Sequence, residues 1–186
     1  MKPVLPTLAI LALSAPAALA HATFEQTEVT RNTVERFVVR IPHGCGAEPT
    51  LRLRVAIPHG LVGVQPMPKG GWDLDTVHGS FDEPVTSGGR EITEGVQEIV
   101  WEGELRTDFY DEFVFRARIT EAVPAGEMLW IPVVQECETA AERWIELPGP
   151  DQSPADLSRP APGVMVLPAA DDDHGHGHSH GHSHGD

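Results

Sequence analysis

The chain has 186 residues and is strongly acidic, with 28 Asp and Glu against 13 Lys and Arg and a formal charge of −15. This balance excludes a nucleic-acid-binding protein, because phosphate binding requires a basic surface that the sequence does not supply. Its 40% apolar content is enough for one ordinary domain with a hydrophobic core.

The first 20 residues have the three parts of an export signal. Lys2 gives a positive start, residues 5–13 are apolar, and Ala18-Leu19-Ala20 supplies the small residues of a cleavage site. The apolar run contains prolines and is shorter than the roughly 20 residues that a membrane span needs. We therefore expect a mature protein that begins at His21, is periplasmic or secreted, and keeps no stable membrane span.

Alternating apolar and polar residues are the main structural signal along 21–150. In 51–57 the leucines, Val55 and Ile57 alternate with two arginines, and 112–119 alternates around two phenylalanines. Turn sequences rich in Gly and Pro separate such segments, which favours an all-β fold, an immunoglobulin- or fibronectin-like β-sandwich. Strands are expected at 22–30, 34–41, 51–57, 72–78, 96–101, 112–120, 128–135 and 142–147.

Beyond the predicted domain, 151–168 is rich in proline and is expected to be an extended strap or linker. The tail, 169–186, has almost no apolar surface and is expected to be disordered. Its alternation of histidine with Gly and Ser favours a native metal-capturing tail over an expression tag, and imidazoles on flexible spacers suit Cu(II), Ni(II) or Zn(II) alike. The tail histidines are His174, His176, His178, His180, His182 and His184.

The chain contains two cysteines, Cys45 and Cys137. In an oxidising compartment a distant pair is first interpreted as a disulfide. The alternative is a pair of soft copper ligands, but neither cysteine lies in a C-x-x-C motif. The sequence therefore favours the disulfide.

A histidine at the mature N-terminus has a chemistry that an internal histidine lacks. The free amine and the ring Nδ1 of His21 can bind one metal ion as a chelate, and both groups titrate near neutral pH. Nitrogen ligands of this kind suit Cu(II). The alternative is that cleavage merely leaves a histidine at this position, but the histidine-rich tail on the same chain favours a metal role.

Strand pairing gives an expectation of which residues lie near His21. A hairpin of 112–120 with 128–135 would bring Glu112 close to Gln135, and a turn after it would bring Trp144 close to Val134. If the first strand runs parallel to 142–147, His21 lies near Trp144. The alternative is that Trp144 is only a core residue and Glu112 only a solvated charge.

The sequence resembles the YcnI-like family of exported copper-binding domains. The segments that carry the resemblance are HATFE, RIPHGCGAEPTLRLRVAIPHGL, VQPMPKGGWDLDTV, EGVQEIVWEGE, YDEFVFRARIT and WIPVVQECETAAERWIELPGP. The resemblance implies a β-sandwich that holds Cu(II) through one N-terminal histidine, with a carboxylate and a tryptophan beside the metal. In this sequence His21 and Trp144 match the histidine and the tryptophan, whereas the carboxylate, Glu112 with Glu35 in reserve, is chosen from the strand-pairing argument.

We therefore expect a periplasmic Cu(II)-binding protein, and not an enzyme, that scavenges, buffers or delivers copper. Its expected partners are the copper ion and another periplasmic copper chaperone or a membrane copper transporter. The alternatives are a zinc or nickel store that works through the tail, and a copper-dependent oxidase. An oxidase of the polysaccharide-cleaving kind needs a second ligand histidine, and none is evident in the domain.

Overall fold

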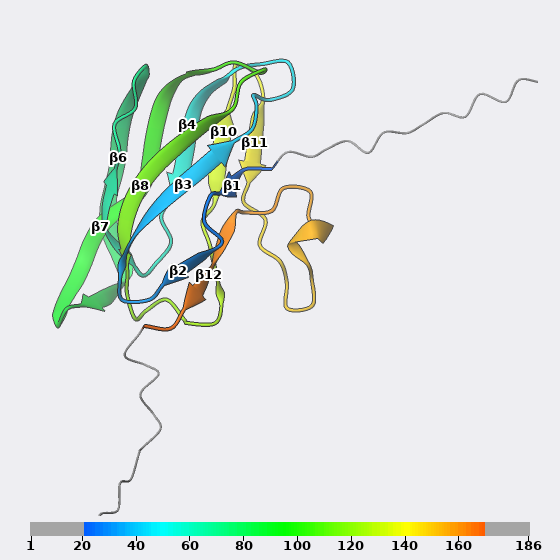
Figure 1. Cartoon of the computed structure of the whole chain (residues 1–186). Helices are drawn as coiled ribbons and strands as arrows, with labels where there is room; N and C mark the ends of the chain where they lie inside the picture. Colours follow the sequence, from blue (N-terminus) through cyan, green and yellow to red (C-terminus); the bar gives the residue numbers. More distant parts are fainter. Residues whose placement is uncertain (1–20, 170–186) are drawn as a thin grey trace, which may run out of the picture.

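The computed structural model describes residues 21–169, which form a β-sandwich of two large sheets with a third, small sheet beside them (Figure 1). The first sheet has the order β1 (Thr23–Phe24), β3 (Val34–Ile41), β8 (Asp111–Ile119), β5 (Leu61–Pro66). The second has the order β11 (Ala141–Trp144), β10 (Val133–Glu136), β4 (Thr50–Ala56), β7 (Arg90–Leu105), β6 (Trp72–Ser87). The third has the order β2 (Glu28–Thr30), β12 (Gly163–Leu167), β9 (Met128–Trp130).

The core lies between the two large sheets and follows the predicted alternation. Phe113 and Phe115 of β8 are buried, as are Leu53 and Val55 of β4. The ring of Phe113 lies 5.5 Å from that of Trp101 on β7, which joins the two sheets by an edge-to-face contact. The all-β sandwich predicted from the sequence is confirmed.

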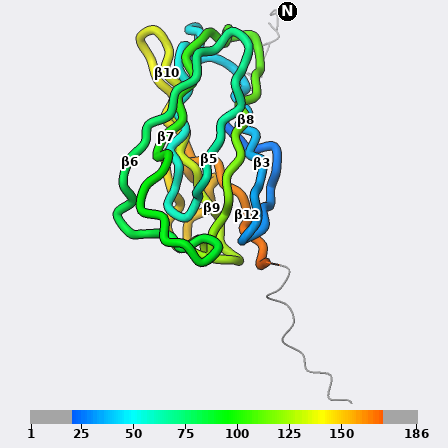
Figure 2. The backbone as a smooth tube through the Cα atoms, turned by 90° about the vertical axis from the view of Figure 1, so that its left-hand side faces the viewer, coloured from blue at the N-terminus to red at the C-terminus, as the bar shows by residue number. Residues whose placement is uncertain are grey.

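The hairpin of β6 and β7 is longer than the predicted strands 72–78 and 96–101. Both strands run for 16 residues, interrupted by irregularities in their register, and the hairpin lies along one edge of the molecule (Figure 2). Gly88 and Gly89 connect them with φ of +57° and +73°. Two successive positive φ values are what a tight type I′ turn requires, so this turn accepts glycine far better than bulky residues.

The predicted pairing of 112–120 with 128–135 is wrong. β8 pairs with β3 and β5 of the first sheet, whereas β9 pairs with β12 and β10 pairs with β4 and β11. The expected single strand is split at Pro132, which has no N–H to continue a ladder. The turn near Gly126 therefore connects different sheets and does not close a hairpin.

The C-terminal part of the domain also differs from the prediction. The expected linker 151–168 contains β12, whose Val164 and Val166 are fully buried. β12 runs parallel to β2, so the N-terminal segment does lie beside the last strand, but that strand is 163–167 and not 142–147. The domain therefore extends beyond residue 150.

The predicted signal peptide and the six tail histidines lie outside the described residues. Between residues 21 and 169 the only helix is the single turn Pro154–Asp156, and no helix there is long and apolar enough to cross a bilayer.

Candidate metal centre

His21 lies against Trp144 where the edges of the two large sheets meet. β1, which begins two residues after His21, is the edge strand of the first sheet, and β11, which ends at Trp144, is the edge strand of the second. The two ring centroids are 5.4 Å apart with an angle of 67° between the planes, an edge-to-face contact. Trp144 is 4% exposed. The proximity expected from the sequence is present, and a metal role for either residue stays a prediction.

The two ring nitrogens of His21 differ in their surroundings. Nε2 is buried and has no hydrogen-bond partner among residues 21–169. In this position Nε2 is closed to solvent, so an ion from solvent does not reach it. Nδ1 is the ring nitrogen that can chelate an ion together with the backbone nitrogen of His21.

The buried side chain of Gln135 forms a hydrogen bond with Trp144 and helps to hold the indole in position. It is 1% exposed, and its amide group donates to Thr50 Oγ1 at 2.6 Å and to the backbone oxygen of His43 at 2.5 Å. Its Oε1 accepts a hydrogen bond from Trp144 Nε1 at 3.4 Å. Buried polar groups that are this fully bonded rigidify their surroundings, so the position of Trp144 is determined by Gln135 as well as by apolar packing.

The disulfide lies beside Gln135. Cys45 and Cys137 are bonded with an S–S distance of 2.06 Å, and Cys45 Sγ is 3.8 Å from the backbone oxygen of Gln135. The predicted disulfide is therefore confirmed, and the alternative of two soft copper ligands is not supported. The bond ties the loop after β3 to the residue that follows β10.

Glu112 does not contact His21 in this structure. It lies on β8 opposite Arg40 of β3, which in turn lies opposite Thr23 of β1. Two strand spacings, about 10 Å, therefore separate the backbone of Glu112 from that of Thr23. The expected approach of Glu112 to Gln135 is not seen, because it depended on the incorrect hairpin.

The Glu112 carboxylate is instead engaged with its own neighbours. It accepts hydrogen bonds from Tyr110 and from Arg40 Nε, the latter at 3.2 Å. The bond from Tyr110, aided by Arg40 and opposed by partial burial, lowers the pKa of Glu112 below its usual range. Arg40 also lies 3.5 Å from Glu25, a carboxylate on the segment that follows His21.

Glu35, the reserve carboxylate, lies at the other end of β3. It accepts hydrogen bonds from Thr30 N at 3.1 Å and Thr33 Oγ1 at 2.8 Å. Five residues separate it from Arg40, about 17 Å along a strand. Glu35 is therefore too far from His21 to share a metal ion with it.

Across residues 21–169, no three histidine, cysteine, aspartate or glutamate side chains come together in a cluster that could hold a metal ion. To bind an ion on His21, Glu25 and Glu112 would have to move away from Arg40. The arrangement at His21 thus offers one histidine, a buried indole and nearby carboxylates that are held by arginine.

His21 also lines an apolar groove of about 500 Å³. The groove is lined as well by Phe24, by Trp130 and Met128 of β9, and by Pro160 and Pro162. This groove could not be predicted from the sequence, because its walls come from three segments that are far apart along the chain.

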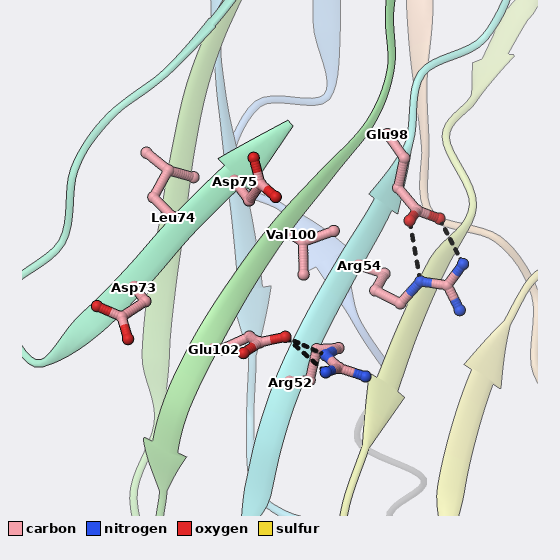
Figure 3. A pocket seen from close by; sticks show the side chains of 8 residues that line it. All are labelled: Arg52, Arg54, Asp73, Leu74, Asp75, Glu98, Val100 and Glu102. Atoms are coloured by element: carbon pink, nitrogen blue, oxygen red, sulfur yellow. Dashed lines mark hydrogen bonds and ion pairs between the residues drawn. The ribbon is translucent and has the colours of Figure 1, made fainter. Parts of the chain in front are cut away.

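A second hollow, about 400 Å³, lies on the outer face of the five-stranded sheet (Figure 3). There Arg52 pairs with Glu102 at 2.5 Å and Arg54 pairs with Glu98 at 2.8 Å. These are cross-strand ion pairs between partly exposed side chains, which contribute little individually. The hollow is lined by no histidine or cysteine, so we do not assign the metal site to it.

Comparison with known proteins gives a family and a fold. A family model described as "Domain of unknown function (DUF1775)" matches residues 21–166. Among solved structures, the chain is similar to an uncharacterized protein from Nocardia farcinica with an immunoglobulin-like fold, at a TM-score of 0.60 and 15% identity. That likeness covers 79% of this chain and 98% of the other, and at this identity it shows the fold alone. No curated protein matches the chain. Because the family model covers most of the sequence, this protein belongs to the DUF1775 family, which is the YcnI-like family.

Proposed function

We propose that the mature protein is an exported Cu(II)-binding protein that scavenges, buffers or delivers copper, and that it is not an enzyme. The observation that carries the proposal is the contact of His21 with the buried Trp144, at the position where export would leave His21 as the first residue. Copper is the cargo of this protein in the proposal.

The proposed ligands are the amine and Nδ1 of His21. Chelation by two groups of one residue needs no second segment to be positioned, so the second bond forms almost intramolecularly. The burial of Nε2 supports this choice, because it leaves Nδ1 as the ring nitrogen for the ion, and the contact with Trp144 restricts the ring. Trp144 then shields one side of the ion and does not act as a strong ligand.

Glu112 remains the proposed carboxylate. To reach an ion on His21 it would have to release Arg40 and Tyr110, and its lowered pKa means that it is ionised at neutral pH and needs no deprotonation. Arg40 could keep Glu25 as its partner when Glu112 leaves. The proposed partner that exchanges copper with this site is a periplasmic chaperone or a membrane transporter.

The test is Cu(II) affinity, measured by competition with a chelator on mature chains that end at Pro168. Without the tail histidines, His21→Ala should weaken the tight site by more than about 100-fold, since even residues outside the ligand sphere typically contribute 10–100-fold. The control is His78→Ala, because His78 is an exposed histidine on β6 and should leave the affinity unchanged. Equal affinities for the two variants would reject the proposal and move copper binding away from His21.

A further inference from the structure

The outer face of the small sheet carries methionines where a polar surface is expected. Leu129 of β9 and Val164 and Val166 of β12 point into the core, so the residues that alternate with them face outward. Two of these outward residues are Met128, which is 36% exposed, and the half-buried Met165. The solvent-exposed face of a sheet usually carries polar residues, so two methionines at this place are unusual.

The two methionines lie directly opposite each other. Met165 is the cross-strand partner of Met128 in the antiparallel pair of β12 and β9, and Met165 is also the partner of Glu28 in the parallel pair with β2. Residues directly opposite in an antiparallel pair have Cβ atoms about 4.5–5.5 Å apart. The sheet therefore places a carboxylate and two thioethers in one row across three strands.

Gly163 allows an indole to lie next to this row. A Cβ at Gly163 would be 2.5 Å from Cε3 of Trp130 and 2.9 Å from Cε of Met128. Both side chains therefore lie over the bare backbone of β12 at the same point, with the terminal methyl group of Met128 close to the ring of Trp130. Contacts between methionine sulfur and aromatic rings are favourable in themselves.

These groups share a preference for one class of ligand. Thioethers are soft donors that select Cu(I) among the biological copper and zinc ions. The face of an indole attracts a cation, and the carboxylate of Glu28 adds a negative charge beside Met165. An ordinary apolar patch needs neither the pairing of two methionines nor a flanking carboxylate.

We infer that Met128 and Met165 form a binding site for a soft monovalent cation of the Cu(I) class, flanked by Trp130 and Glu28. Two of its members, Met128 and Trp130, line the same groove as His21. It uses no atom of His21, so it does not depend on the proposed Cu(II) site. It would let the protein hold copper in either oxidation state at two neighbouring places.

The first test uses Ag(I), a redox-inert probe of Cu(I) sites, and the mature full-length chain with ¹³C-labelled methionine methyl groups. After the expected cleavage the chain has three methionines, Met67, Met128 and Met165, and Met67 is exposed at the end of β5. Silver is added beyond the capacity of the six tail histidines. The methyl signals of Met128 and Met165 should shift together and saturate, whereas that of Met67 should stay in place. No shift of the pair, or an equal shift of all three, would overturn the inference.

The second test separates this site from the Cu(II) site. Met128→Leu/Met165→Leu keeps the side-chain volume nearly constant, so the fold should be retained. The double variant should lose one equivalent of tightly bound Cu(I) in competition with a chromophoric Cu(I) chelator, and Met67→Leu should lose none. The Cu(II) spectrum of the double variant should equal that of the parent chain. Full retention of Cu(I) would refute the thioether site whatever the result for His21.

Discussion

Removal of the disulfide should destabilise the domain strongly without changing its fold. Cys45 and Cys137 are separated by 92 residues, and in the chain-entropy model a loop of this length contributes about 4.6 kcal/mol at 25 °C. Whole domains are stable by roughly 5–15 kcal/mol, so Cys45→Ala/Cys137→Ala should lose a third or more of the free energy of unfolding. For a chain of this size the melting temperature should fall by roughly 9–18 °C.

The folded state has other contacts at the same place, which is why the fold should survive. The Glu48 carboxylate accepts hydrogen bonds from Thr139 N at 2.8 Å and from Ala140 N at 3.1 Å. These contacts join the two loops that carry the cysteines. The loss should therefore arise mainly from the greater freedom of the unfolded chain, and the native spectrum should be unchanged.

The assay is urea unfolding of the parent chain and the double alanine variant, with near-UV circular dichroism to check the native state. The parent chain after reduction should match the variant. A destabilisation below about 1 kcal/mol would contradict the loop-entropy argument, which assigns several times that value to so long a loop.

Three further predictions concern the surroundings of the site and the tail. Gln135→Leu should leave the backbone oxygen of His43 and the N–H of Trp144 without their buried hydrogen-bond partner. Each such unpaired group should lower the free energy of unfolding by about 1–3 kcal/mol. Urea unfolding measures this loss, and a changed near-UV circular dichroism spectrum would report the altered packing of Trp144. Deletion of 169–186 should lower the number of metal ions bound but keep one tight Cu(II) site and the melting temperature, as measured by titration and calorimetry; loss of all Cu(II) binding would assign the function to the tail. The pKa of Glu112 is lowered in the folded state, so the ionised carboxylate stabilises the fold at any pH above the pKa of Glu in the unfolded chain, about 4.3. This stabilisation is lost as the pH falls through the lower pKa of the folded state. Glu112→Gln should therefore flatten the decline in stability on the acid side, and an unchanged acid profile would show that Tyr110 and Arg40 do not act on it as described.

The faces of the strands could be predicted from the sequence, but not all their neighbours. The alternation of apolar and polar residues determines which residues of 113–119 point inward, because successive side chains of a strand point to opposite faces whatever strand pairs with it. The alternation does not determine which strand is the neighbour, so the turn after Ile119 was mistaken for a hairpin. β12 was missed because its short apolar run follows a proline-rich segment and gives no clear alternation of its own.

The proximity of His21 and Trp144 could be predicted, although one premise was inaccurate. β11 pairs with β10 within one residue of the expected register, with Trp144 opposite Val133. The contact with His21 arises where the edge strands of the two sheets meet, and not from parallel pairing of the first strand with β11. Tyr110 lies only two residues from Glu112, but the hydrogen bond from Arg40 could not be predicted, because it depends on β3, which pairs with β8 from far away in the sequence.

Electron paramagnetic resonance of Cu(II) bound to two mature chains that both end at Pro168 tests directly whether the amine of His21 binds copper. One chain begins at His21, and the other has a single alanine before it, which turns the amine of His21 into an amide. Because an amide nitrogen does not readily give up its proton to bind metal, we expect the extended chain to lose the nitrogen couplings of the chelate and the tight affinity. Identical spectra and identical affinities for the two chains would contradict Cu(II) binding through the amine of His21.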